Sequence, residues 1–178
     1  MSSINPQDLP HYTYDDYCLW EGRWELIQGI PYAMTPAPSI NHQSISNKIA
    51  HELTESLSHC ENCHALLPVD WKITEDTVVQ PDNLVVCFPL EGIYISQAPA
   101  VIFEVLSPST AKKDREMKFN LYEREGVEYY IIVDPTDRIA KVFQRISGKF
   151  QKLLDTREET VTFSINDCDM PFNFQHIF

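Results

Sequence analysis

The sequence predicts an α/β protein with a central mixed β-sheet that is flanked by α-helices and followed by a C-terminal β-hairpin. The main observation is an apolar run at 101–106, then a helical stretch at 111–124 and a further apolar run at 129–133. This order is typical of a βαβ unit, in which a right-handed crossover makes the two strands parallel. The strands predicted before this unit are joined by short turns, so the sheet is expected to be mixed.

The first residues are predicted to form a loose leader. Residues 1–12 show no apolar repeat, and the length of 178 residues fits one domain that spans 1–178. Thr13 can cap a short helix, because the acidic side chains that follow it suit a helix N-terminus. Residues 24–28 and 30–34 flank a Gln-Gly turn and are rich in β-forming side chains, which predicts a strand pair.

A long helix is predicted over residues 40–58, with Ser39 as its N-cap. Its apolar residues recur at a spacing of four and form one stripe for the core. They are Ile45, Ile49, Leu53 and Leu57. After this helix, residues 65–73 and the continuous apolar run 83–87 are each predicted to be a strand. Residues 88–99 contain Pro and Gly and are predicted to be a loop.

The last part of the chain is predicted to be mainly β-structure. Gly126 is expected to close the helix 111–124, because glycine tolerates the left-handed conformation of a C-cap. Residues 139–143 and 150–154 are predicted to form the terminal hairpin across a Ser-Gly turn. Residues 160–164 are predicted to add an edge strand.

Composition and charge limit the classes of function. No apolar run reaches 18 residues and no secretory signal is visible, so a cytoplasmic protein without membrane contact is predicted. The net charge of −12 counts against a general nucleic-acid coat protein, which usually presents a basic face. It does not exclude a nuclease, because acidic side chains that bind divalent cations themselves add negative charge.

The cysteines predict no disulfide framework, because their number is five, which is odd, and the context looks intracellular. The segment HCENCH offers His59, Cys60, Cys63 and His64 as zinc ligands, and its Cys-x-x-Cys-His pattern also matches c-type haem attachment. Six consecutive residues give poor tetrahedral geometry, and haem attachment requires export. The simpler interpretation is a helix end and loop with incidental thiols.

Two acidic residues interrupt apolar runs that are predicted to be neighbouring strands. They are Asp82 and Glu104. An ionised carboxylate in such a place is costly unless a charge or a metal ion compensates it, and Mg²⁺ takes carboxylate oxygens. The structural alternatives are that Asp82 belongs to a turn after Pro81, and that Glu104 is paired with a basic residue in the core.

Lys118 follows on the predicted helix, four residues from Asp114 and four from Tyr122, so the three share one helix face. A helix packed over the sheet would bring Lys118 back to the carboxylates, where it could orient water or offset the charge of a phosphate. The simpler interpretation is a surface pair between Asp114 and Lys118. Spacing alone favours that pair.

The sequence resembles the Uma2 family, which belongs to the PD-(D/E)XK restriction-endonuclease-like superfamily. The resemblance rests on the order and spacing of short motifs over most of the chain. These are Trp24–Gly29, His42, Glu75–Asp82, Phe103–Thr110, Asp114, Lys118, Tyr122 and Gly126–Pro135.

The resemblance implies a restriction-endonuclease-like core and a set of site residues. Asp82 and Glu104 match the metal-binding acids of the superfamily, and Glu25 matches a further family acid that completes the site. The usual lysine lies two residues after the second acid, where this chain has Leu106. In similar proteins the lysine has moved to the next helix, which points to Lys118.

The implied function is a metal-dependent endonuclease that uses Mg²⁺ or Mn²⁺ to hydrolyse phosphodiester bonds in nucleic acid, with DNA as the expected substrate. A homodimer is expected by analogy alone. The alternative is an inactive module of the same fold that binds or regulates, which the acidic charge favours. Lys112, Lys113 and Arg115 form a basic cluster that could meet a phosphate backbone, whereas His42 is assigned no chemistry.

Overall fold

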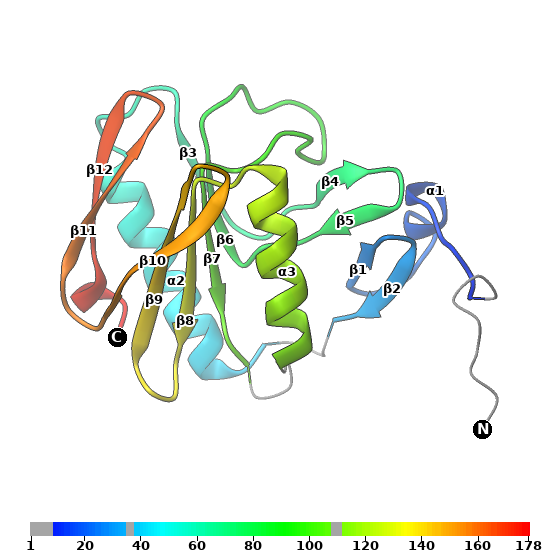
Figure 1. Cartoon of the computed structure of the whole chain (residues 1–178), viewed down its shortest axis with the longest axis horizontal. Helices are drawn as coiled ribbons and strands as arrows, with labels where there is room; N and C mark the ends of the chain where they lie inside the picture. Colours follow the sequence, from blue (N-terminus) through cyan, green and yellow to red (C-terminus); the bar gives the residue numbers. More distant parts are fainter. Residues whose placement is uncertain (1–8, 35–37, 108–111) are drawn as a thin grey trace.

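The computed structural model describes residues 9–34, 38–107 and 112–178, with side chains from Arg115 onward in the last range. Its centre is a six-stranded sheet in the order β10-β9-β8-β7-β6-β3 (Figure 1). The strands are β3 (His64–Leu66), β6 (Asn83–Val86), β7 (Val101–Val105), β8 (Tyr129–Asp134), β9 (Ile139–Ile146) and β10 (Lys149–Thr156). β7 and β8 are parallel and the other neighbouring pairs are antiparallel, so the predicted mixed sheet is confirmed.

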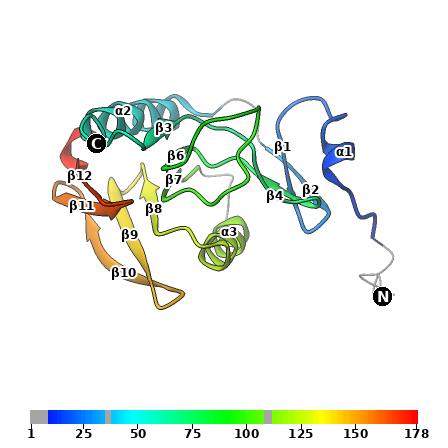
Figure 2. The ribbon, with the colours of Figure 1, turned by 90° about the horizontal axis from the view of Figure 1, so that it is seen from above.

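Two helices cover opposite faces of this sheet (Figure 2). α2 (Ile40–Ser56) begins where predicted, and its cap Ser39 accepts a hydrogen bond from the amide of His42. Its apolar stripe packs on one face of the strands, while α3 (Lys112–Glu125) packs on the other face through Leu121 and Tyr122. Alternating strand residues therefore face two different cores, which explains why these strands read as continuous apolar runs.

A smaller sheet stands at one end of the molecule, in the order β2-β1-β5-β4. Its strands are β1 (Trp24–Ile27), β2 (Ile30–Ala33), β4 (Trp71–Thr74) and β5 (Thr77–Val79). The predicted strand pair is β1–β2, and the predicted short helix is α1 (Tyr14–Tyr17), which Thr13 and Asp16 close with a capping box. In the described part of the predicted leader, the amide of Tyr12 donates to Gly29 at 2.9 Å.

The expectation of one strand over residues 65–73 is wrong. β3 lies in the large sheet and β4 in the small sheet, so the chain leaves one sheet for the other between Leu66 and Trp71. Pro68 lies in this passage and has no amide hydrogen to donate to a strand neighbour.

The C-terminal part contains two hairpins. The predicted hairpin is β9–β10 and forms the edge of the large sheet. The predicted edge strand at 160–164 is β11 (Thr160–Ile165), but it pairs with β12 (Cys168–Asn173) in a separate two-stranded sheet, and η2 (Phe174–His176) follows. β12 is not predicted from the sequence, because Pro171 interrupts its β-pattern. Phe163 and Phe172 of this hairpin pack with Phe103 on the α2 side of the sheet.

The expectation of no disulfides is also wrong. Cys60 is bonded to Cys168 and Cys63 to Cys87, and Cys18 is exposed and free. The first bond joins the loop after α2 to β12, over a sequence separation of 108 residues. An odd number of cysteines does not prevent disulfide formation, because one of them, Cys18, remains unpaired and exposed while the other four form two bonds.

Candidate active site

Three acidic side chains reach the junction of the two main sheets. Glu25 lies on β1 of the small sheet, Glu104 on β7 of the large sheet, and Asp82 in the link from β5 to β6. In the antiparallel β6–β7 pair, Asn83 lies opposite Phe103, so Asp82 and Glu104 come next along the same ladder. The expected neighbourhood of these two acids is therefore present, although Asp82 lies one residue before its strand.

Lys118 of α3 joins the two sheets at this point. Its Nζ lies 2.7 Å from Oε1 of Glu25 and 3.1 Å from Oε1 of Glu104. The side chain of Lys118 is only 13% exposed, so the simpler interpretation of a surface lysine is wrong. The side chain of Asp114 lies outside the described residues. Lys118 therefore supplies a cation beside Glu25 and Glu104, although residue 106 is a leucine.

Glu104 is held by two donors and has an unusual protonation equilibrium. Besides Lys118, the hydroxyl of Tyr122 donates to Oε1 at 2.7 Å. Burial raises the pKa of Glu104 against the opposing charge of Lys118, and with the charges of Asp82 and Glu25 the net result is a pKa of about 8. Burial would lower the pKa of Lys118, but the charges of Glu104 and Glu25 outweigh it and keep the pKa above its usual value. Lys118 is therefore a fixed positive charge.

Asp82 is held by a histidine and a backbone amide. Its Oδ2 lies 3.1 Å from Nε2 of His42 and accepts a hydrogen bond from the amide of Val105 at 2.9 Å. Burial would raise the pKa of Asp82, but the bond to His42 outweighs it and the pKa is lowered. The same bond raises the pKa of His42. Asp82 is thus more than a turn residue, and His42, to which we assigned no chemistry, positions it.

Gln80 is a further site residue that the sequence analysis missed. Its backbone amide donates to Oε1 of Glu25 at 2.9 Å, the oxygen that also meets Lys118. Its side chain donates to Asp70 at 2.7 Å and to the hydroxyl of Tyr17 at 3.1 Å. Gln80 lies within the Glu75–Asp82 motif of the resemblance, but nothing in its residue type reveals a role for its backbone amide.

Comparison with known proteins agrees with this architecture. The sequence model of the Uma2 family, described as "Putative restriction endonuclease", matches residues 13–167. This chain belongs to the Uma2 family. It is 31% identical over 137 residues to a Synechocystis sp. protein described as uncharacterized, which covers 72% of this chain and 71% of the relative.

A solved structure shares the fold of this Uma2 protein. The crystal structure of a putative nuclease of the DUF820 group from Anabaena variabilis superposes with a TM-score of 0.75, at 17% identity. The match covers 93% of this chain and 97% of that chain. The predicted restriction-endonuclease-like fold class and family are therefore confirmed. No helix in the described ranges is long and apolar enough to cross a membrane.

The carboxylates of the Uma2 protein fit a hard divalent cation. The bonds from His42 and Val105 both end on Oδ2 of Asp82, and those from Lys118 and Tyr122 both end on Oε1 of Glu104. Each acid is held in these bonds through one oxygen. Among the described residues these acids do not gather three ligand atoms within 4.8 Å of one another. Two carboxylates, with water and phosphate oxygens completing the shell, is a common arrangement for Mg²⁺.

The HCENCH segment does not form the zinc or haem site that its sequence offers. Cys60 and Cys63 bond to Cys168 and Cys87, so neither thiol is free for haem attachment or for a zinc site with His59 and His64. The simpler interpretation of incidental thiols is wrong as well, because both thiols are covalently used.

The stability of the Uma2 protein should depend on pH through Glu104. Its pKa rises on folding from 4.5 to about 8, so within this window the folded protein binds more protons than the unfolded chain. Stability then falls as pH rises, by at most about 1.4 kcal/mol per pH unit. Glu104→Gln removes this pH dependence. We therefore expect the free energy of unfolding of the variant, measured relative to wild type, to increase as pH rises from 4.5 to about 8. Denaturant unfolding across this range measures the difference, and a constant difference would contradict the raised pKa.

Proposed function

We propose that this Uma2 protein is a metal-dependent endonuclease that hydrolyses phosphodiester bonds in nucleic acid, with DNA as the substrate. The observation that carries the proposal is the contact of Lys118 with both Glu104 and Glu25, beside Asp82. Two carboxylates and one lysine, held in a mostly buried place at a sheet junction, match the needs of metal-assisted hydrolysis of a phosphate ester.

Each side chain has a separate role in this proposal. Asp82 and Glu104 would hold Mg²⁺ or Mn²⁺, which supplies Lewis-acid stabilisation and a more acidic bound water. Lys118 stays protonated between two acids, so it acts as a hydrogen-bond donor and positive charge toward the phosphate, not as a base. Glu25 and the amide of Gln80 position the lysine, and His42 positions Asp82.

Cleavage of supercoiled plasmid tests the proposal. We expect purified protein with Mg²⁺ or Mn²⁺ to nick or linearise the plasmid, and we expect Asp82→Ala and Glu104→Ala to lower the rate by roughly 10²- to 10³-fold. Glu52→Gln is the matched control, because Glu52 is also buried but bonds to His176 at 2.7 Å, away from this junction. Circular dichroism confirms that each variant is folded.

Two outcomes would count against the proposal. Equal activity in wild type and both variants would indicate a contaminating nuclease. Absence of cleavage on DNA and RNA, with either metal, would favour the inactive binding or regulatory module. The same assay on RNA tests the choice of DNA, and light scattering of the purified protein tests the homodimer that the family resemblance implies.

A further inference from the structure

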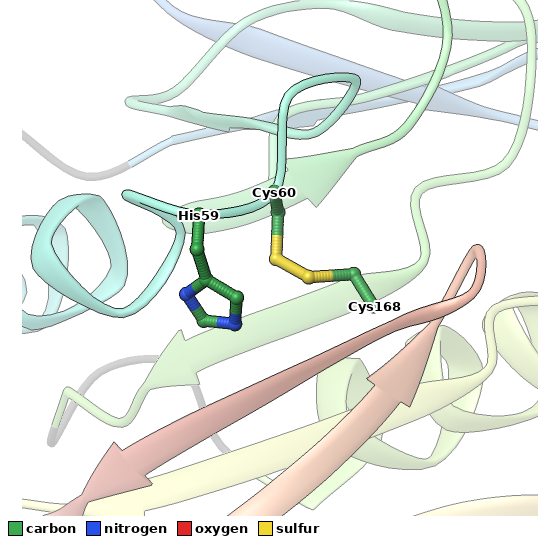
Figure 3. Close-up of side chains that lie close together, drawn as sticks. All are labelled: His59, Cys60 and Cys168. Carbon is green, nitrogen blue, oxygen red and sulfur yellow. A yellow bond between two sulfur atoms is a disulfide. The ribbon is translucent and has the colours of Figure 1, made fainter.

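A second group of metal-ligating side chains lies away from the carboxylates. His59, Cys60 and Cys168 each offer one ligand atom, and these atoms lie within 4.8 Å of one another. Cys60 and Cys168 are joined as a disulfide, and the imidazole of His59 lies beside it (Figure 3). Cys60 is buried and His59 is exposed. The three residues come from two segments that are about a hundred residues apart in sequence, which is why the HCENCH segment alone did not reveal the group.

The donor types indicate which metal would suit this group. Thiolate and imidazole are ligands of zinc and other borderline or soft cations, whereas Mg²⁺ takes oxygen. With Zn–S near 2.3 Å, two thiolates of a tetrahedral site lie about 3.8 Å apart. The two bonded sulfurs would therefore have to move apart after reduction, and the three ligand atoms start within 4.8 Å of one another. We propose that reduction of the Cys60–Cys168 disulfide creates a zinc site formed by both thiolates and the imidazole of His59.

The reaction balances with a dithiol as the reductant. The dithiol gives two electrons and two protons, the bond between the sulfurs of Cys60 and Cys168 breaks, and the dithiol becomes a cyclic disulfide. Zinc then replaces the two thiol protons, which pass to solvent. The protein would alternate between a disulfide in an oxidising environment and a zinc site in a reducing one, with the same two cysteines joining the loop after α2 to β12 in both states.

Two features near the group favour metal binding. The Nε2–H of His59 donates to the backbone carbonyl oxygen of Asp169 at 2.9 Å, which holds the imidazole against the strand that carries Cys168. Nδ1 is then the nitrogen that would bind the metal. Imidazole ligands of metals usually have such a second contact. An open hollow lined by residues 164–169 includes Cys168 in its wall, so solvent reaches the group from this side.

Metal content and cobalt spectra test this proposal on the full chain. The protein is reduced with a phosphine, which is oxidised to its oxide with oxygen from water, and is then loaded with Zn²⁺ in excess Mg²⁺ and desalted. We expect one zinc per reduced chain and none in the oxidised chain. Co²⁺ should give a thiolate-to-metal charge-transfer band in the reduced protein only. Cys168→Ser should abolish both signals, and His59→Asn should weaken zinc binding about tenfold or more.

Two control variants separate this site from the other sites. Cys63→Ser with Cys87→Ser removes the other disulfide pair, and Glu104→Gln alters the carboxylate site, so both should keep the zinc and the cobalt band. Zinc retained in Cys168→Ser, or absent from the folded, reduced wild type, would overturn the proposal. His59→Asn changes an exposed side chain, so unchanged zinc affinity in that variant would also overturn it. None of these measurements depends on nuclease activity.

Discussion

Lys118→Met is expected to lower the free energy of unfolding by about 3–5 kcal/mol at pH 8 to 9, because it leaves two buried carboxylates without their cation. Oε1 of Glu25 and Oε1 of Glu104 both contact Nζ of Lys118, and the side chains of both acids are at most 13% exposed. The cost should be smaller at pH 5, since Glu104 is readily protonated. Denaturant unfolding at the two pH values measures both effects.

A matched lysine and a rescue variant make this prediction specific. Lys72 is buried to a similar extent, with 16% exposure, but its partner Glu75 is 74% exposed. Lys72→Met should therefore cost clearly less than Lys118→Met, because water solvates the carboxylate of Glu75 that is left behind. Adding Glu25→Gln and Glu104→Gln to Lys118→Met should recover much of the lost stability, since no uncompensated charge remains. Equal costs for Lys118→Met and Lys72→Met would contradict the buried cluster.

Removing the Cys60–Cys168 disulfide is expected to cost more stability than removing the Cys63–Cys87 disulfide. The first closes a separation of 108 residues and the second one of 24 residues. The entropy of the unfolded chain then predicts losses of about 4.8 and about 3.4 kcal/mol. The measurement is denaturant unfolding of the oxidised, zinc-free proteins with each pair replaced by alanine. A reversed order would show that strain or contacts, and not loop entropy, decide the contribution of these bonds.

The sequence was most informative where residue type conflicts with its surroundings. Glu104 stands out because a carboxylate interrupts an apolar strand. The helix that follows made Lys118 a candidate partner, but spacing alone favoured a surface pair for it, and the family resemblance was needed to point to Lys118. The strand, helix and turn patterns likewise predicted the central sheet and both main helices. Glu25 is different, because only the family resemblance pointed to it. On its own strand it looks like an ordinary acid beside apolar residues.

What could not be predicted depends on contacts between distant parts of the chain. No local pattern pairs Cys60 with Cys168, and no periodicity shows that residues 65–73 pass from one sheet to another. Gln80 acts through its backbone amide, which every residue except proline has. His42 needed the fold to bring it to Asp82, 40 residues later in the sequence.

The bond from Lys118 to one acid in each sheet means that the proposed site is complete only in a fully assembled molecule. Glu25 arrives with the small sheet, whereas Glu104 belongs to the large one. Proteins open in parts at lower free energy than they unfold as a whole. A nascent or partly opened chain, with its large sheet formed and its small sheet detached, would lack Glu25. Under the proposed function, such a chain would lack the acid that positions Lys118, so full cleavage activity would require the two sheets to be joined.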